Sequence, residues 1–191
     1  MRKTITLFRL ILNNRQNTIF KVSEKRTHQR LNSSYLYPVK VTFLSVGKTH
    51  DREIAALCER YVQRLKIQCN FQWIETQDIK SSNPQELKTK EGQLIRQHTG
   101  KSDHIILLDE TGKQFTSREF SAFIQKKQLE NKKQILFVLG GAFGFSEEIY
   151  ALAAEKISLS KMTFPHQLVR LIFVEQLYRA YSILNNEPYH H

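Results

Sequence analysis

The chain has 191 residues, of which 40% are hydrophobic, and a formal net charge of +11. This length fits one domain with room for a tail, and the absence of an uncharged apolar stretch of about 18 residues argues against a membrane span. The two cysteines, Cys58 and Cys69, lack the spacing of metal ligands, so no metal site is expected and both are predicted to be buried, reduced thiols.

The first 38 residues differ in composition from the rest. They hold eight lysines and arginines against one acid, whereas residues 39–191 hold twenty-one against seventeen. An acid-poor, arginine-rich stretch with one apolar cluster, residues 5–12, is typical of an organellar targeting segment. A translated stretch upstream of the true start is the alternative. We therefore expect an extension over residues 1–38 and one folded domain over residues 39–191, whose mild basicity permits an RNA partner.

Five short runs rich in apolar and β-branched residues predict β-strands. Two of them, residues 105–108 and 135–139, are continuously apolar, as is typical of strands buried on both faces of a parallel sheet. The polar stretch Asp109–Lys113 is expected to form a turn. In chain order the predicted strands are residues 39–46, 71–74, 105–108, 135–139 and 157–159.

A helix is predicted after each strand. Asp51 is a candidate N-cap, and Asn83 combines a cap with proline at the first helical position. The second helix is expected to end near Gln97, the fourth near Glu155 and the last at or beyond Tyr181. The five predicted starts are Asp51, Asn83, the capping box at Thr116, Ser146 and Pro165.

Strict alternation of strands and helices predicts an α/β layer fold with a mostly parallel sheet. Ligands of such sheets bind beyond the carboxyl ends of the strands. Three ends are suited to this: Leu108–Asp109, Gly140–Gly141 and Leu159–Ser160. The glycines match neither the dinucleotide fingerprint nor a phosphate-binding loop, so a generic nucleotide-binding protein is a weak option.

The last predicted helix is apolar nearly all round. A helix that covers one side of a small domain needs only a stripe of apolar residues. This helix is therefore expected to lie in the core or against a second subunit. Glu175 and Arg179 stand four residues apart on it and are expected to form an ion pair.

Several motifs, taken together and in order, resemble the RlmH family. These SPOUT-class methyltransferases act on a pseudouridine in large-subunit ribosomal RNA. The resemblance covers residues 39–191, and Val39 stands where the family begins with methionine, which favours a bacterial start near that residue over a targeting segment. The matching motifs are Val39-Lys40-Val41, Gly140-Gly141-x-x-Gly144, Leu159–Arg170, Glu175–Tyr181 and Pro188-Tyr189-His190.

The resemblance implies an α/β knot, in which the C-terminal part of the chain forms a trefoil knot. It also implies S-adenosylmethionine as methyl donor and a homodimer with the last helix at the interface. The implied partner is ribosomal RNA, in the large subunit or the assembled ribosome. The implied location is the bacterial cytoplasm, or an organelle if residues 1–38 are a targeting segment.

The resemblance also assigns residues to a site. On the substrate side we rank four: His166, Arg179 to orient or neutralise a developing anion, and Tyr189 and His190 to hold the nucleoside. The expected cofactor contacts are Leu108, Gly140, Gly141, Leu159, Ser160, Lys161, Met162, Thr163 and Phe164. The rival hypothesis is a non-catalytic RNA-binding or ribosome-associated module.

Overall fold

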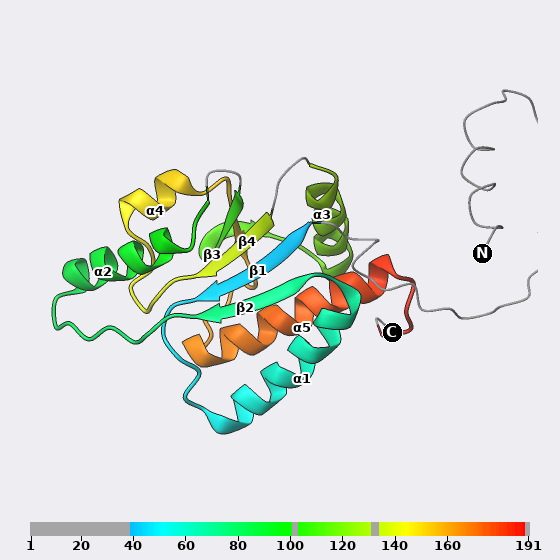
Figure 1. Ribbon diagram of the computed structural model, residues 1–191, viewed down its shortest axis with the longest axis horizontal. Helices are drawn as coiled ribbons and strands as arrows, with labels where there is room; N and C mark the ends of the chain where they lie inside the picture. Colours follow the sequence, from blue (N-terminus) through cyan, green and yellow to red (C-terminus); the bar gives the residue numbers. More distant parts are fainter. Residues whose placement is uncertain (1–38, 101–102, 131–133, 190–191) are drawn as a thin grey trace, which may run out of the picture. The chain divides into compact units, whose positions relative to one another are not determined.

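The computed structural model describes residues 39–100, 103–130 and 134–189 (Figure 1). The predicted extension over residues 1–38 lies outside the described residues, as does His190. The elements alternate as predicted: β1 (Lys40–Ser45), α1 (Arg52–Gln68), β2 (Phe71–Glu75), α2 (Pro84–Gln97), β3 (Asp103–Gln114), α3 (Ser117–Leu129), β4 (Gln134–Leu139), α4 (Glu147–Leu152), β5 (Glu155–Ser158) and α5 (His166–Leu184).

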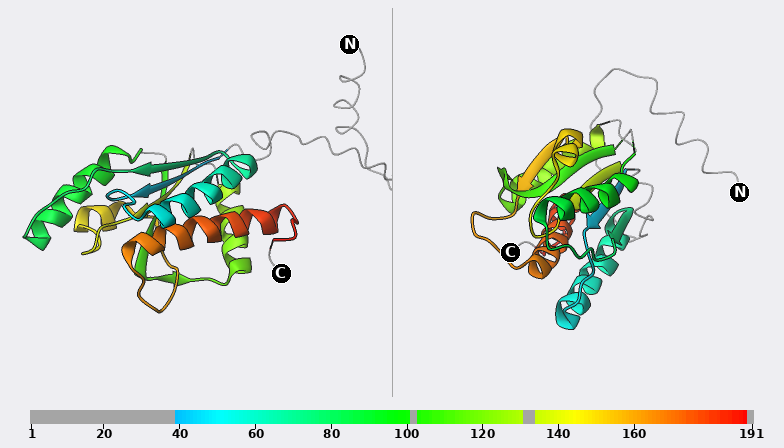
Figure 2. Two further views of the ribbon diagram at one scale, coloured as in Figure 1. Left: turned by 90° about the horizontal axis from the view of Figure 1, so that it is seen from below. Right: turned by 90° about the vertical axis from the view of Figure 1, so that its left-hand side faces the viewer.

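The five strands form one sheet in the order β2-β1-β4-β3-β5, and all neighbouring strands run parallel. The predicted parallel α/β fold is therefore confirmed. Apolar residues on β1 serve both faces, since Phe43 packs into one core cluster and Leu44 into the other. Helices α1, α3 and α5 contribute to the first cluster and α2 and α4 to the second (Figure 2). The threading that defines a trefoil knot stays a prediction.

Three of the predicted helix caps are confirmed. The side chains of Asp51 and Asn83 accept backbone hydrogen bonds from the first turns of α1 and α2, and Thr116 forms the capping box with Glu119. Ser146 is different, because it makes no side-chain cap bond. Its hydroxyl is buried against α2 instead, 2.6 Å from the place that a Cβ on Gly92 would take.

The predicted end of the fourth helix is wrong. Helix α4 ends at Leu152, and Glu155 begins β5. There the Glu155 carboxylate lies 2.7 Å from Nε2 of His104 and 2.5 Å from Nζ of Lys127. These contacts with a neighbouring strand and with α3 place Glu155 in the sheet, and no local pattern of the sequence reveals them.

The predicted turn at Asp109–Lys113 is also wrong, because β3 continues through it. The strand pairs with β5 on both sides of a register shift between Leu108 and Lys113. Gly112 allows this approach, since a Cβ there would lie 2.5 Å from the backbone of Ile157. The long strand β3 therefore pairs with the short strand β5 as far as Ser158, where the loop to α5 begins.

Helix α5 lies beside α1 and packs against both α1 and α3 (Figure 2). One face is buried in the core, whereas several apolar side chains of the rest are only half-buried, among them Leu171, Ile172 and Tyr178. Of the two expected locations, the core and the surface of a second subunit, the structure shows the first for one face of this helix. No helix within the described ranges has the length and hydropathy that crossing a membrane requires.

Candidate active site

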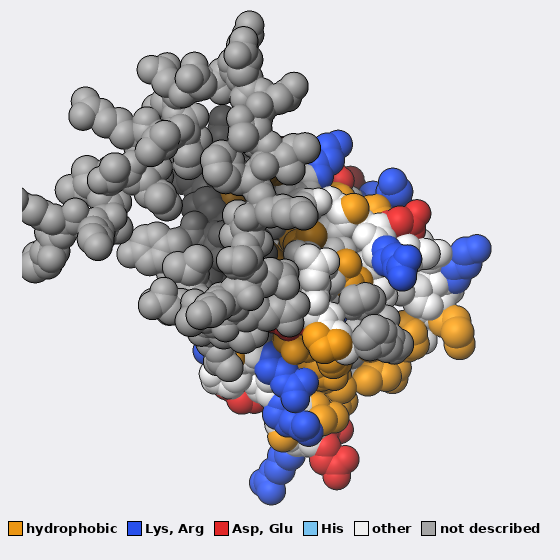
Figure 3. Space-filling view, turned by 90° about the vertical axis from the view of Figure 1, so that its right-hand side faces the viewer, with side chains coloured by type: hydrophobic (Ala, Val, Ile, Leu, Met, Phe, Trp, Pro, Cys, Tyr) orange, Lys and Arg blue, Asp and Glu red, His pale blue; other side chains and the backbone are white. Residues whose placement is uncertain are grey.

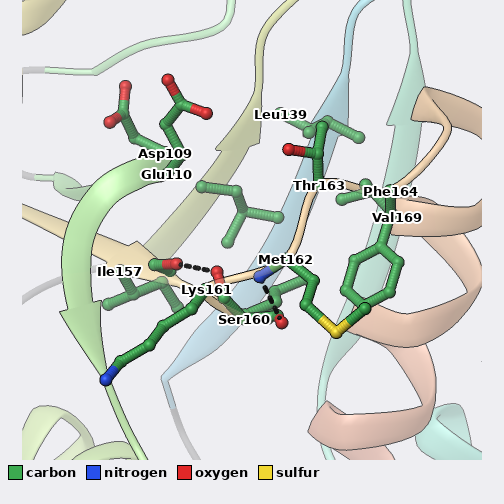
Figure 4. Close-up of a pocket in the computed structure, with 13 residues that line it drawn as sticks. Asp109, Glu110, Leu139, Ile157, Ser160, Lys161, Met162, Thr163, Phe164 and Val169 are labelled. Carbon is green, nitrogen blue, oxygen red and sulfur yellow. Dashed lines mark hydrogen bonds between the residues drawn. The ribbon is translucent and has the colours of Figure 1, made fainter.

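A pocket lies beyond the carboxyl ends of β4 and β5 and beside the register shift in the middle of β3 (Figure 4). Leu108 comes from β3, and Leu139 ends β4. The rest of the wall comes from residues 157–164, which include the β5–α5 loop, and from Val169 in the first turns of α5. This is the edge at which parallel sheets bind ligands.

The loop from Leu159 to Phe164 is held by its own hydrogen bonds. The backbone nitrogen of Met162 donates to Oγ of Ser160 at 2.8 Å, and Oγ of Ser158 donates to the Ser160 carbonyl at 2.8 Å. Both bonds are drawn in Figure 4, where the side chains of Met162 and Phe164 lie next to each other. The loop thus offers backbone polar groups beside an apolar surface, a combination that suits a planar heterocycle.

Two acidic side chains, Asp109 and Glu110, line the same pocket. Burial would raise the pKa of Asp109, but hydrogen bonds from Thr111 and Tyr150 outweigh it and hold the pKa below its usual value. The Tyr150 hydroxyl donates to Oδ2 of Asp109 at 2.7 Å, and burial together with this carboxylate raises the pKa of Tyr150 to about 12. Asp109 therefore stays ionised, and the pocket carries negative charge that favours a cationic ligand.

Seven of the nine expected cofactor contacts line this pocket, and Gly140 and Gly141 do not. They follow Leu139 directly, and both are tightly packed. A Cβ on Gly140 would lie 2.9 Å from the Phe145 ring, and one on Gly141 would lie 2.3 Å from the Glu91 carboxylate. Glycine is therefore required at both positions because the loop packs too closely for a larger residue.

Sequence reasoning missed Glu91. Its side chain is 6% exposed, burial raises its pKa, and its Oε2 has no hydrogen-bond partner within the described residues. The available signal is a carboxylate in the apolar stripe of α2, since Glu91 stands four residues from both Leu87 and Ile95, which are buried.

The first turns of α5 are fixed to the loop after β1. The buried Arg170 donates from Nη1 to Oγ1 of Thr49 at 2.8 Å and to Oε1 of Glu75 at 3.0 Å, and from Nη2 to the Val46 carbonyl at 2.7 Å. Gln167 adds a bond from its Nε2 to the Lys48 carbonyl at 3.1 Å. These hydrogen bonds therefore fix the first turns of α5, which line the pocket, to the loop after β1.

His166 lies at this same end of α5. Its pKa is lowered, first by burial and then by the charge of Arg170, so the ring is neutral near pH 7. Its Nε2 is buried without a hydrogen-bond partner within the described residues. The structure therefore places His166 with the β1 loop, thirteen positions before Arg179 on the same helix.

Arg179 and Tyr189 do come together, on the carboxylate of Glu175. Arg179 donates to Oε1 of Glu175 from Nη2 at 2.7 Å and from Nε at 3.1 Å, which confirms the predicted ion pair. The Tyr189 hydroxyl donates to the same oxygen at 3.2 Å, and its ring centroid lies 5.0 Å from the Arg179 guanidinium carbon. Burial raises the pKa of Tyr189 and the nearby Glu175 carboxylate raises it further, so its phenol stays protonated.

The sequence matches the family model described as "Predicted SPOUT methyltransferase" over residues 39–190. The chain belongs to the SPOUT methyltransferase family. Among curated relatives, a "Ribosomal RNA large subunit methyltransferase H" from Christiangramia forsetii is 49% identical over 154 residues, which cover 79% of this chain and 98% of that protein. Proteins of the same name from Parabacteroides distasonis and Bacteroides fragilis are 47% and 44% identical over 157 and 156 residues, in each case 80% of this chain and 99% of the relative. The resemblance to the RlmH family is thereby confirmed.

In this SPOUT methyltransferase the two groups of candidate residues occupy different parts of α5. Val169 lines the pocket, whereas Arg179 follows ten positions later. With an axial rise of 1.5 Å per residue, the two lie about 15 Å apart along the helix. One subunit therefore does not bring its own Arg179 next to its own pocket.

A second hollow of this SPOUT methyltransferase, between α1 and β2, is larger, about 500 Å³ against about 180 Å³. It lies beside the edge strand, and most of its exposed lining is polar. Glu75 in its wall is already bound by Arg170. Because a ligand pocket is mostly apolar with a few directed polar groups, the smaller pocket is the better cofactor site despite its size.

Proposed function

We propose that this chain uses S-adenosylmethionine to methylate N3 of a pseudouridine in large-subunit ribosomal RNA. The observation that carries the proposal is the pocket built by Leu159–Phe164 beyond the carboxyl ends of β4 and β5, in a chain of the SPOUT methyltransferase family. The names of its relatives support the large-subunit RNA as the substrate.

The residues of the pocket fit this donor. Leu108, Met162 and Phe164 are apolar and can flank the adenine, while the loop backbone can bind its polar edge. Ionised Asp109 complements the positive charge of the donor. When bound, S-adenosylmethionine supplies a methyl group already activated by the sulfonium. The remaining task of the protein is therefore to align the nucleophile.

Arg179 and Tyr189 serve the nucleoside. N3 becomes nucleophilic when its proton passes to water, and the resulting charge spreads onto the two neighbouring carbonyl oxygens of the base. Hydrogen-bond donors placed at those oxygens stabilise that charge. Glu175 holds both side chains in one place and leaves Nη1 of Arg179 free of Glu175, so that Arg179 can donate to the base. The Tyr189 hydroxyl would have to turn from Glu175 to donate to the base.

The complete site belongs to a homodimer. Arg179 lies about 15 Å along α5 from the pocket of its own subunit, and part of the surface of that helix is apolar and only half-buried. A two-fold dimer formed through α5 would cover this surface and bring the Glu175 cluster of one subunit to the pocket of the other.

Ribosomal RNA as substrate places the protein where ribosomes are assembled. We expect the bacterial cytoplasm, in line with bacterial relatives at 44–49% identity. Residues 1–38 leave an organelle as the alternative, which the mass of the mature native protein decides.

The test uses ribosomes from a bacterial strain that lacks its own enzyme of this kind. Purified protein and S-adenosylmethionine are added, and the ribosomal RNA is mapped by mass spectrometry. One added methyl group on one pseudouridine of the large-subunit RNA is expected. Ribosome binding without methylation, together with no heat of S-adenosylmethionine binding in calorimetry, would instead favour the RNA-binding module.

A further inference from the structure

Helix α1 contributes two residues to the Glu175 cluster that neither the motifs nor the comparisons assign. The hydroxyls of Tyr61 and Tyr189 lie 3.0 Å apart. Since Tyr189 gives its single proton to Glu175, Tyr61 is the donor in this pair. The guanidinium carbon of Arg64 lies 5.9 Å from the Tyr61 ring centroid and 5.7 Å from that of Tyr178.

These contacts fix the C-terminal tail on α1. Asn186 has a positive φ of 53°, which turns the chain after α5. The tail is then bound by Gln68, whose Nε2 donates to Oε2 of Glu187 at 2.6 Å. The ring of Tyr189 packs edge-on against Tyr178 at a centroid distance of 4.7 Å. Together with Tyr178 and Gln68, Tyr61 therefore determines where the Tyr189 hydroxyl lies.

Three of the arginines on α1 and α5 differ in what holds their charge. The buried Arg170 forms an ion pair with the half-buried Glu75, and Arg179 gives two hydrogen bonds to Glu175. Arg64 is exposed, and no carboxylate within the described ranges forms an ion pair with it. Two aromatic rings lie within 6 Å of its exposed guanidinium, and the planar fork of donors that a guanidinium carries suits phosphate oxygens.

We propose that Arg64 and Tyr61 belong to the RNA-binding side of the active site. Arg64 binds a backbone phosphate of the substrate RNA, and Tyr61 is a positioning residue for Tyr189. This inference rests on the proposed function, because it takes ribosomal RNA as the ligand. The side of the molecule at which α5 ends carries, outside the grey atoms, hydrophobic side chains with lysines and arginines beside them and some acidic side chains between these (Figure 3). The lysines and arginines there can contact RNA phosphates.

The Arg64 contact is tested with Arg64→Met and with Arg60→Met as the matched control. Arg60 is an exposed arginine of the same helix, so both variants lose the same charge. Ribosome binding of the full-length dimer is measured by filter retention over a range of salt concentrations. We expect Arg64→Met to weaken binding roughly tenfold and to reduce the slope of log affinity against log salt by about one. Arg60→Met is expected to stay within about twofold of wild type.

Two results would overturn this contact. Equal losses in both variants would mean that only net charge matters. An unchanged ribosome affinity in Arg64→Met, with a weaker dimer in sedimentation, would mean that Arg64 pairs with the second subunit instead. Filter retention does not depend on methyl transfer, so a protein that binds ribosomes without methylating them rejects the proposed function and still tests Arg64.

Tyr61→Phe tests the positioning role, because it removes only the hydroxyl. We expect kcat for ribosome methylation to fall about tenfold, as is usual for the loss of one orienting hydrogen bond. The KM for ribosomes and the Kd for S-adenosylmethionine are expected to stay within about twofold. A merely structural hydroxyl would lower the melting temperature and leave kcat unchanged, and that result would reject the proposal.

Discussion

The two ends of α5 use the same chemistry in opposite environments. At its start Arg170 binds Glu75, and its side chain is 1% exposed. Towards its end Arg179 binds Glu175, and these side chains are 27% and 18% exposed. The first pair joins the helix to the chain's own β1 loop, whereas the second holds Tyr189 at the surface. The first pair lies beside the proposed cofactor pocket, and the second lies in the cluster that we propose for the substrate.

The strongest test of this division mixes two defective proteins. Thr163→Trp fills the pocket from an exposed loop position, and Arg179→Ala removes the substrate-side cation. We expect each homodimer to be inactive. After unfolding and refolding of equal amounts together, half of the dimers are mixed and one of the two sites in each is intact. About a quarter of the wild-type methylation rate should return.

Each variant refolded alone serves as the control and should stay inactive. If the mixture is also inactive although sedimentation shows dimers, the two ends of α5 do not act across subunits, and the composite site is wrong.

Stability measurements separate the two ion pairs. Arg170→Met leaves Glu75 without its buried partner, and we expect the free energy of unfolding to fall by about 3 kcal/mol. Arg179→Met breaks the more exposed pair and should cost less than about 1 kcal/mol. Urea denaturation measures both. Similar losses in the two variants would contradict the contrast, and the double variant Arg170→Met/Glu75→Gln should recover part of the larger loss.

Gly112 tests the strand pairing that supports the cofactor end. A Cβ there meets backbone atoms of Ile157 at 2.5 Å, so Gly112→Ala is expected to lower the free energy of unfolding by about 1–3 kcal/mol. In Gly92→Ala the nearest atom is the Ser146 hydroxyl at 2.6 Å, which can rotate away, and a helix favours alanine. This control should change stability by less than about 1 kcal/mol in the same urea titrations.

The smallest expected effect is the pH response of His166. Its pKa in the folded protein is lowered from an ordinary value of about 6.5, so folding favours the neutral ring. The stabilisation is present above the unfolded pKa and is lost as the pH falls through it towards the folded value. Between about pH 7.5 and 5.5 the melting temperature of wild type should fall more than that of His166→Gln. Parallel curves for the two proteins would show that the ring does not titrate.

Local sequence patterns predict the parts of this fold that depend on neighbouring residues. Asp51, Asn83 and Thr116 cap helices because a side chain meets the backbone two or three positions away. Asp109–Lys113 has the composition of a turn, yet it continues β3 because Gly112 admits a distant strand. Pairing between strands far apart in the sequence overrides the local preference there.

The candidate site divides in the same way. The loop from Leu159 to Phe164 is predicted by its motif, and it does line the pocket. Glu91 and Arg64 are not predicted, because their environment depends on which face of α2 meets a distant loop and which face of α1 meets α5. A single helical sequence gives the periodicity of its faces but not the residues that they contact.

The position of α5 at the end of the chain has a consequence for synthesis. Phe173, Val174 and Leu177 belong to the same core cluster as residues of α1 and α3, which are made earlier. A nascent chain therefore cannot close this core until its last helix is free to pack. Until then, the apolar faces of α1 and α3 stay open to chaperones and to other chains. This core therefore closes only after α5 has left the ribosome.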